Sequence, residues 1–339
     1  MRPKLGFLLS VFLLASVTGV SGGAETPAPP VDPAAPGRVE VSLGEVVLGM
    51  TTDRTVYSPG EAVLVDLGIG NTSEKEVAVN TVQTVVGGSE GPMPTAGIKW
   101  LPAEVRILGL KGREVWDSTT YTSKERAITE RVLPGGSLSW FTYLWPQFGP
   151  KGKVVSAGDY AVEAQFLLSR KSWEGGFPRL NLPVSIASQS IHPFYQVEKE
   201  GLTWRVDVDR AEFQPGQAVH LKLVVANVGK EPVTILWPQQ FLDSYFVICD
   251  SGGKQVWTNK LSEEQRGFAP LWPTPVTFPP GDCRLVARGG WDGMIETVAE
   301  DTGEKRRVNA PPGEYTLQTV RGFLSMPIFE DLKFSLVAP

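Results

Sequence analysis

Few residues of this chain could perform chemistry, and one serine sits in a pattern typical of catalysis. The stretch GGSEG, residues 87–91, fits the G-x-S-x-G elbow that presents a nucleophilic serine, which would be Ser89. That elbow aims the serine by means of a helix that follows it directly. Here the sequence continues GPMPTAG, whose prolines prevent a helix. We interpret the stretch as a loop, and we expect neither a catalytic residue nor enzymatic activity.

Residue spacing gives equally little support for a metal or a cofactor. The chain has two histidines, His192 and His220, and two cysteines, Cys249 and Cys283. Metal sites and general bases need convergent partners, and these four residues show no ligand spacing. The GIG triplet at residues 68–70 lacks the third glycine and the following helix of a dinucleotide-binding loop. We therefore expect no metal site and no cofactor.

Paired carboxylates can divide the acid and base roles of an enzyme, but most such pairs are solvated. Asp207 with Asp209, and Glu263 with Glu264, are pairs of this kind. Because Asp and Glu are rarely buried without partners, we predict that both pairs lie on faces exposed to water.

The chain contains ten tryptophans. Four of them recur at matching places of the repeat described next, so we predict that they pack in cores. Trp237 and Trp272 each stand before a proline in an LWP triplet, where a tryptophan either packs or is displayed as a platform for sugars or peptides. The four tryptophans predicted to pack are Trp116, Trp145, Trp257 and Trp291.

One motif is written twice, and it sets the architecture. DRTVYSPGEAV, residues 53–63, returns as DRAEFQPGQAV at residues 209–219. Later landmarks also match, such as GREVW with GKQVW and AGDYAVEAQF with PGEYTLQTVR. In each copy the Pro-Gly pair predicts a turn that feeds a long strand, and Asn71 and Asn227 fall where that strand ends. The pattern indicates one duplicated domain rather than a short solenoid repeat.

Each copy has the sequence pattern of short strands linked by turns. AVLVDLGIGN and AVHLKLVVAN alternate with a period of two, and SLSWFTYLW, DYAVEAQF, YFVIC and EYTLQTV are runs rich in β-branched and aromatic residues. Val219 and Leu221 belong to an inward face, so His220 between them is predicted to point outward. The pattern predicts an all-β protein of two tandem immunoglobulin-like antiparallel β-sandwich domains, residues 38–187 and 197–339.

The first residues are typical of an export signal. Arg2 and Lys4 precede an apolar run that small residues follow, so residues 1–24 are predicted to be a signal peptide. Residues 25–37 form a Pro/Ala-rich spacer. We expect an exported protein, in the periplasm, the cell envelope or the medium, without an integral membrane segment in the mature chain. A net charge of −5 argues against nucleic acid as a partner.

Export makes a disulfide between Cys249 and Cys283 chemically possible. Cys249 aligns with Leu108 of the first copy, an apolar position that a free cysteine also suits. The sequence favours neither alternative.

The second copy resembles a known family. It runs FQPGQAVHLKLVVANVGKEPVTILWPQQFLDSYFVICDSGGKQVW and later carries WDG and PPGEYTL. These features resemble the BsuPI-type domain, named for a bacterial intracellular proteinase inhibitor, over roughly residues 209–320. The first copy resembles it less closely, over roughly residues 53–166. The resemblance implies an all-β immunoglobulin-like fold and proteinase inhibition.

We therefore expect an exported, non-enzymatic module that binds a protein partner, which the resemblance implies is a proteinase. The loop between Trp257 and Gly281 is the candidate contact, because its prolines lower the entropy lost on docking. A structural or adhesive spacer of the cell envelope and a carbohydrate-binding module that uses exposed tryptophan are the alternatives. The candidate contact residues are Phe268, Pro270, Leu271, Trp272 and Pro273.

Overall fold

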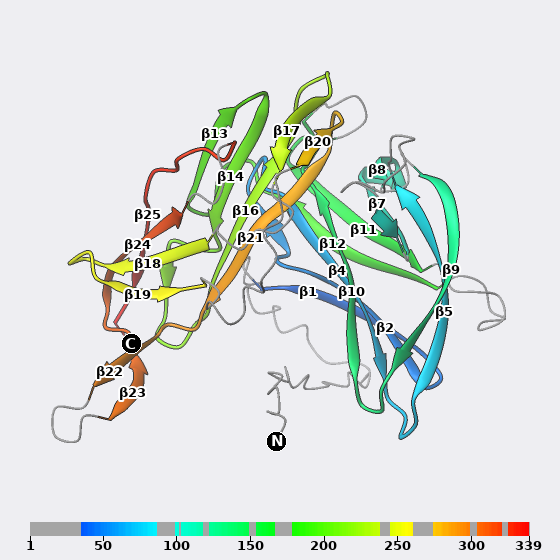
Figure 1. Ribbon diagram of the computed structural model, residues 1–339, viewed down its shortest axis with the longest axis horizontal. Helices are drawn as coiled ribbons and strands as arrows, with labels where there is room; N and C mark the ends of the chain where they lie inside the picture. Colours follow the sequence, from blue (N-terminus) through cyan, green and yellow to red (C-terminus); the bar gives the residue numbers. More distant parts are fainter. Residues whose placement is uncertain are drawn as a thin grey trace, which may run out of the picture. The chain divides into compact units, whose positions relative to one another are not determined.

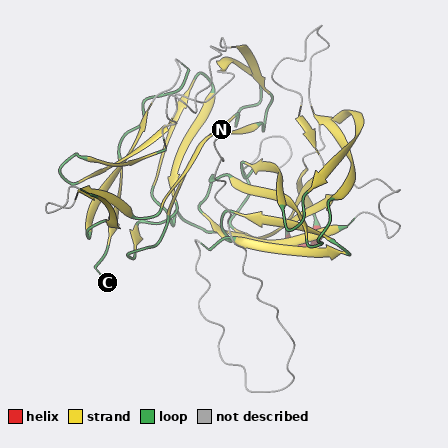
Figure 2. Ribbon diagram, turned by 60° about the horizontal axis from the view of Figure 1, so that its bottom comes forward, coloured by secondary structure: helices red, strands yellow, loops and turns green. Residues whose placement is uncertain are grey.

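The computed structural model of the chain is all-β across its described residues, and Figure 2 shows strands and loops almost throughout. Helical residues in this part are confined to the 3-10 turn η1 (Leu110–Gly112), so it contains no helix that could span a bilayer. The predicted signal peptide and most of the spacer lie outside it. The described residues are 35–86, 99–101, 103–117, 122–148, 154–166, 178–237, 245–259, 274–298, 304–320 and 325–338.

The first repeat forms two larger sheets and one smaller sheet (Figure 1). The order of the four-stranded sheet is β1-β2-β4-β10, and that of the five-stranded sheet is β3-β12-β11-β7-β8; the smaller sheet is β6-β5-β9. Neighbouring strands are antiparallel except β3 and β12. The strands are β1 (Gly37–Leu43), β2 (Val46–Thr52), β3 (Val56–Tyr57), β4 (Val63–Asn71), β5 (Val77–Val86), β6 (Lys99–Leu101), β7 (Ala103–Leu108), β8 (Glu114–Asp117), β9 (Thr122–Val132), β10 (Ser137–Trp145), β11 (Gly158–Phe166) and β12 (Arg179–Ile186).

The second repeat has the same arrangement of its two larger sheets, with the orders β13-β14-β16-β21 and β15-β25-β24-β18-β19. Two two-stranded antiparallel sheets, β17 with β20 and β22 with β23, are also present (Figure 1). The strands are β13 (Phe194–Lys199), β14 (Leu202–Val208), β15 (Glu212–Phe213), β16 (Val219–Ala226), β17 (Val233–Trp237), β18 (Tyr245–Asp250), β19 (Gln255–Thr258), β20 (Thr274–Phe278), β21 (Cys283–Trp291), β22 (Met294–Val298), β23 (Lys305–Asn309), β24 (Gly313–Val320) and β25 (Leu332–Leu336).

Each repeat encloses its own apolar core, to which both of its larger sheets contribute. Sheets that share one buried cluster pack face to face, which is why alternate residues of their strands are buried. Trp145 and Trp291 are fully buried, which confirms the prediction that they pack. His220, between the buried Val219 and Leu221, is exposed, as its position in the alternation predicts.

The repeated Pro-Gly pair forms the same turn in both copies. Gly60 and Gly216 have φ angles of 74° and 79°, a left-handed conformation that favours glycine. The backbone N–H of Glu61 donates to the carbonyl three residues earlier at 3.1 Å, and that of Gln217 does so at 3.0 Å. The side chain of each also accepts a hydrogen bond from the N–H of that earlier residue, at 2.9 and 2.8 Å. The motif is therefore repeated because it closes a turn.

The repeated aspartate and asparagine bind backbone groups on either side of that turn. Asp53 Oδ1 accepts from the N–H of Leu64 at 3.1 Å, and Asp209 Oδ1 accepts from that of His220 at 2.9 Å. Asn71 and Asn227 each donate from Nδ2 to two backbone carbonyls, one of them four residues later, at 2.7 and 2.8 Å. Buried backbone groups must be paired, so these side chains hold the strand ends in place.

In each repeat a buried tryptophan packs against a tyrosine. The rings of Trp145 and Tyr160 lie 5.4 Å apart, and those of Trp291 and Tyr315 lie 5.3 Å apart. Each indole N–H donates to a carbonyl three residues later, at 3.1 and 2.9 Å. Each tyrosine hydroxyl donates to a carbonyl four residues earlier, at 2.7 Å in both copies. Both polar tips are thereby satisfied, as buried Trp and Tyr require.

Candidate functional site

Residues 260–273 of the candidate contact loop lie outside the described residues, and so do Ser89 and the pair Glu263 and Glu264. The structure therefore does not place the loop residues Phe268, Pro270, Leu271, Trp272 and Pro273.

The remaining tryptophan predictions have mixed outcomes. Trp257 is half-buried and packs against the core of the second repeat rather than lying inside it. Trp116 lies in β8, but its side chain is outside the described part. Trp237 is 5% exposed and packs edge-on against Phe278 at 5.1 Å, so it is not displayed to a ligand.

Both cysteines are buried, and the structure has no disulfide between them. The Cys249 thiol lies 3.8 Å from Gln318 Oε1 on the neighbouring strand. Burial, the largest cause, raises the pKa of this thiol, and Asp250 adds to the effect. Cys283 lies in a small apolar cluster with Ala62 and Val224.

Side chains of both repeats form a buried network of charges, the most concentrated set of charges in the described part of the chain. From the first repeat it takes residues next to β3, and from the second it takes residues of β14 and β16. The buried side chains comprise Arg54, Glu61, Arg205, Asp207 and Lys222, and the partly exposed Asp53 joins them. Three cations thus face three carboxylates, which balances the formal charge, as buried charges require.

Lys222 is the centre of this network. Its Nζ lies 2.7 Å from Asp53 Oδ2 and 2.8 Å from Glu61 Oε1, and it donates to the carbonyl of Ala62 at 2.8 Å. The side chain is 5% exposed. The ammonium group therefore donates two hydrogen bonds, to Asp53 and to Ala62, and forms an ion pair with Glu61, all with groups of the first repeat.

Glu61 joins the turn to the network. Its Oε2 caps the turn at Ser58, while its Oε1 lies 2.5 Å from Arg54 Nη1 and 2.8 Å from Lys222 Nζ. Burial by itself would raise the pKa of Glu61, but the charges of Lys222 and Arg54 outweigh it and hold that pKa at about 2. The carboxyl is therefore ionised at neutral pH and acts as an anchor for cations.

Arg205 and Asp207 continue the network along β14. Arg205 Nε donates to Asp207 Oδ1 at 2.8 Å, and its Nη1 donates to the carbonyl of Pro59 at 2.9 Å. The guanidinium also lies 4.0 Å from the centre of the Phe194 ring. Burial raises the pKa of Asp207, and the charge of Arg205 offsets part of that rise.

The prediction that Asp207 and Asp209 face water was wrong. They are 0% and 2% exposed. Asp209 binds the backbone of the strand that follows the turn, and Asp207 lies on the outer face of β14, which the first repeat covers. Strand periodicity places a residue on an outer face but does not reveal what covers that face.

His192, between the two repeats in the sequence, is also part of this region. Its side chain is 2% exposed, and Nε2 lies 3.9 Å from Glu61 Oε2. Burial, the largest cause, and the positive charge of Arg54 lower the pKa of His192 to about 4, although Glu61 opposes the shift. The imidazole is therefore neutral at pH 7, which leaves the charge balance of the network unchanged.

A sequence signal for the network exists in β16. Val219, Leu221, Leu223 and Val225 face the core, so Lys222, Val224 and Ala226 share the opposite face. Two apolar side chains beside a lysine on an outer face indicate that something covers them. In the structure Val224 and Ala226 form an apolar cluster with Ala62 of the first repeat.

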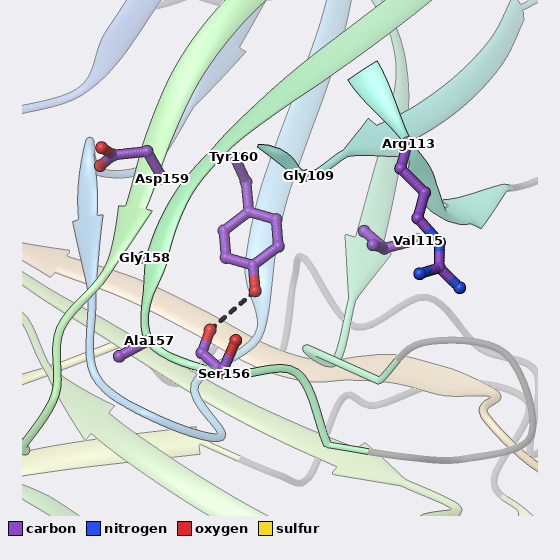
Figure 3. A pocket seen from close by; sticks show the side chains of 8 residues that line it. All are labelled: Gly109, Arg113, Val115, Ser156, Ala157, Gly158, Asp159 and Tyr160. Atoms are coloured by element: carbon purple, nitrogen blue, oxygen red, sulfur yellow. Dashed lines mark hydrogen bonds between the residues drawn. The ribbon is translucent and has the colours of Figure 1, made fainter. Parts of the chain in front are cut away.

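A shallow pocket of about 250 Å³ lies at one end of the first repeat. In Figure 3 the hydroxyl of Tyr160 donates to the carbonyl of Ser156, and Arg113 and Val115 lie across from that tyrosine. The hydroxyl of Tyr160 in the pocket wall is already engaged in this backbone hydrogen bond. Among the described residues, no three His, Cys, Asp or Glu side chains are grouped as metal ligands would be.

Comparison with known proteins gives little guidance. No family model matches the chain, and no curated protein matches it. Among solved structures, the crystal structure of red sea bream transglutaminase is similar with 8% identity and a TM-score of 0.24, covering 88% of this chain and 32% of that one. The chain thus spans about a third of that structure, and a likeness at this TM-score carries no argument.

Proposed function

We propose that the chain is an exported, non-enzymatic module that binds a protein partner. The observation that carries the proposal is that many side chains which could perform chemistry are already bound to other groups of the protein. Arg54, Lys222 and Arg205 form ion pairs with buried carboxylates, and the repeated Asp, Asn and Tyr side chains bind backbone groups. Side chains used in this way stabilise a fold, so recognition falls to loops and strand edges.

The architecture we propose is two tandem immunoglobulin-like β-sandwiches, residues 38–187 and 197–339, after a signal peptide at residues 1–24. Two observations support it. The larger sheets of the two repeats share one strand order. Tyr160 and Tyr315 also each bind a carbonyl four residues upstream, as the tyrosine corner of immunoglobulin-like sandwiches does.

The partner we propose is a proteinase, on the basis of the resemblance between the second repeat and the BsuPI-type domain. The test titrates the mature chain, from residue 25, against purified serine, cysteine and metalloproteinases with fluorogenic peptide substrates. Saturable inhibition of at least one enzyme is the expected result. If none is inhibited, including the proteinases of the source organism, the inhibitor function is refuted.

A matched variant tests the contact loop proposed from sequence. Residues 260–273 are replaced by a short Gly/Ser turn, which removes Phe268, Leu271 and Trp272 together. Loss of inhibition, with an unchanged unfolding transition, is expected if this loop makes the contact. Unchanged inhibition would remove these residues from the site.

A structural spacer of the cell envelope is the second candidate, and the packing between the repeats favours it. The Lys222 network and the Ala62 cluster join the two repeats through buried contacts, as a rigid spacer would need. The carbohydrate-binding alternative loses one of its two displayed tryptophans, because Trp237 is buried. A chain that inhibits no proteinase but is retained on isolated envelopes would support the spacer.

A further inference from the structure

Residues 325–331, which precede β25, include an exposed aliphatic side chain, that of Ile328. Ile328 is 79% exposed, the largest exposed fraction of any large apolar side chain in the described part of the chain. Its neighbours point the other way: Met326 and Phe329 are 0% and 7% exposed and belong to the core of the second repeat. Pro327 is also buried.

Two contacts anchor residues 326–329 to the second repeat. Lys199 Nζ donates to the carbonyl of Met326 at 3.2 Å, and the ring of Phe329 lies edge-on to Tyr195 at 6.1 Å. Pro327 restricts its own φ angle. A loop fixed on both sides of its exposed residue loses little entropy on docking, which is the property that makes a contact loop bind tightly.

We propose that Ile328 is the specificity-determining contact of the second repeat and that it enters the apolar primary pocket of a proteinase. The inference rests on the proposed inhibitor function and names the enzyme class. A branched aliphatic side chain fits the small apolar pocket of elastase-type enzymes, whereas trypsin-type pockets carry an acid and require a cation. The exposed Glu330 and Asp331 next to the loop favour an enzyme with a basic rim.

The test measures inhibition constants of the mature chain for elastase, subtilisin, chymotrypsin and trypsin. Three variants are compared with it: Ile328→Asp, Ile328→Arg, and Leu133→Arg as a control. Leu133 is 64% exposed but lies in the turn before β10 of the first repeat. Both positions are exposed, so the three variants should keep the thermal unfolding midpoint of the original chain.

Inhibition of elastase or subtilisin by the original chain is expected, and Ile328→Asp should weaken it at least ten- to a hundredfold, which is about what burial of one aliphatic side chain contributes to affinity. Ile328→Arg should create inhibition of trypsin, and Leu133→Arg should change nothing.

Two results would overturn the inference and leave the inhibitor function standing: inhibition of an apolar-pocket enzyme that Ile328→Asp does not alter, or inhibition of trypsin alone by the original chain. No inhibition of any of the four enzymes by the chain or its variants would overturn the inference, and the inhibitor function would then depend on the wider panel described above.

Discussion

Replacing Lys222 by methionine should destabilise the protein strongly, because Lys222 connects three acceptors in a buried site. The side chain is 5% exposed, and its Nζ lies within 2.8 Å of Asp53, Glu61 and the carbonyl of Ala62. Methionine retains much of the volume, so the change mainly removes a charge and its donors. Removing one partner of a buried ion pair costs about 3–5 kcal/mol, and we expect a loss of unfolding free energy in this range.

An exposed lysine provides the matched control. Lys333 lies 2.8 Å from Glu314, the same distance that separates Lys222 from Glu61, but the two side chains are 66% and 53% exposed. Exposed ion pairs contribute little to stability, so Lys333→Met should leave the free energy of unfolding nearly unchanged. The two variants differ in burial and not in the length of the ion pair.

The measurement is urea unfolding of the mature chain, followed by tryptophan fluorescence and extrapolated linearly to water. A third variant, Lys222→Met with Glu61→Gln, removes a charge of each sign and should recover part of the loss. If Lys222→Met costs no more than Lys333→Met, the network does not hold the repeats together, and the reasoning is refuted.

Three further predictions follow from single sites. The folded pKa of His192, about 4, lies below the ordinary value of 6.5; the unfolded chain therefore binds more protons between these values, and stability should fall as the pH drops from about 6.5 to about 4. Thermal unfolding across this range should show that slope, and His192→Gln should reduce it. Asn71→Ala should lower the free energy of unfolding in urea by about 1–3 kcal/mol, because it leaves two backbone carbonyls without their donor. A nearly unchanged free energy of unfolding, as expected for substitution of an exposed residue, would contradict this prediction. Thiol titration of the denatured, unreduced protein should find both Cys249 and Cys283 free, and finding neither would mean that they are bridged.

The strands and the repeat could be predicted from sequence, because both are local. Period-two alternation in AVLVDLGIGN and AVHLKLVVAN predicts which residues face a core, and the structure confirms it for β4 and β16. The turn at Gly60 and Gly216 follows from Pro-Gly chemistry in the same way.

The buried network could not be predicted in this manner, because its members lie far apart in the chain. Lys222 and Glu61 come from different repeats, and nothing within either strand identifies the partner. Charged residues on an outer strand face are ordinarily solvated, so the sequence predicts that Asp207 faces water. The only local indication was Val224 and Ala226 beside Lys222, and it shows that the face is covered without showing by what.

One residue of the repeated turn differs between the copies, and this difference means that the two copies cannot exchange places in the chain. Glu61 and Gln217 cap the same turn equally well, but only the carboxylate has a second oxygen whose charge attracts Lys222 and Arg54. The first copy therefore contributes the carboxylate of Glu61 to the contact between the repeats, and the second contributes the ammonium group of Lys222. The two copies are not interchangeable, because in a chain with their order reversed Gln217 would face the first copy, which has Asp66 at the position of Lys222. A third copy could form the same ion pair with the second copy only if a glutamate replaced Gln217.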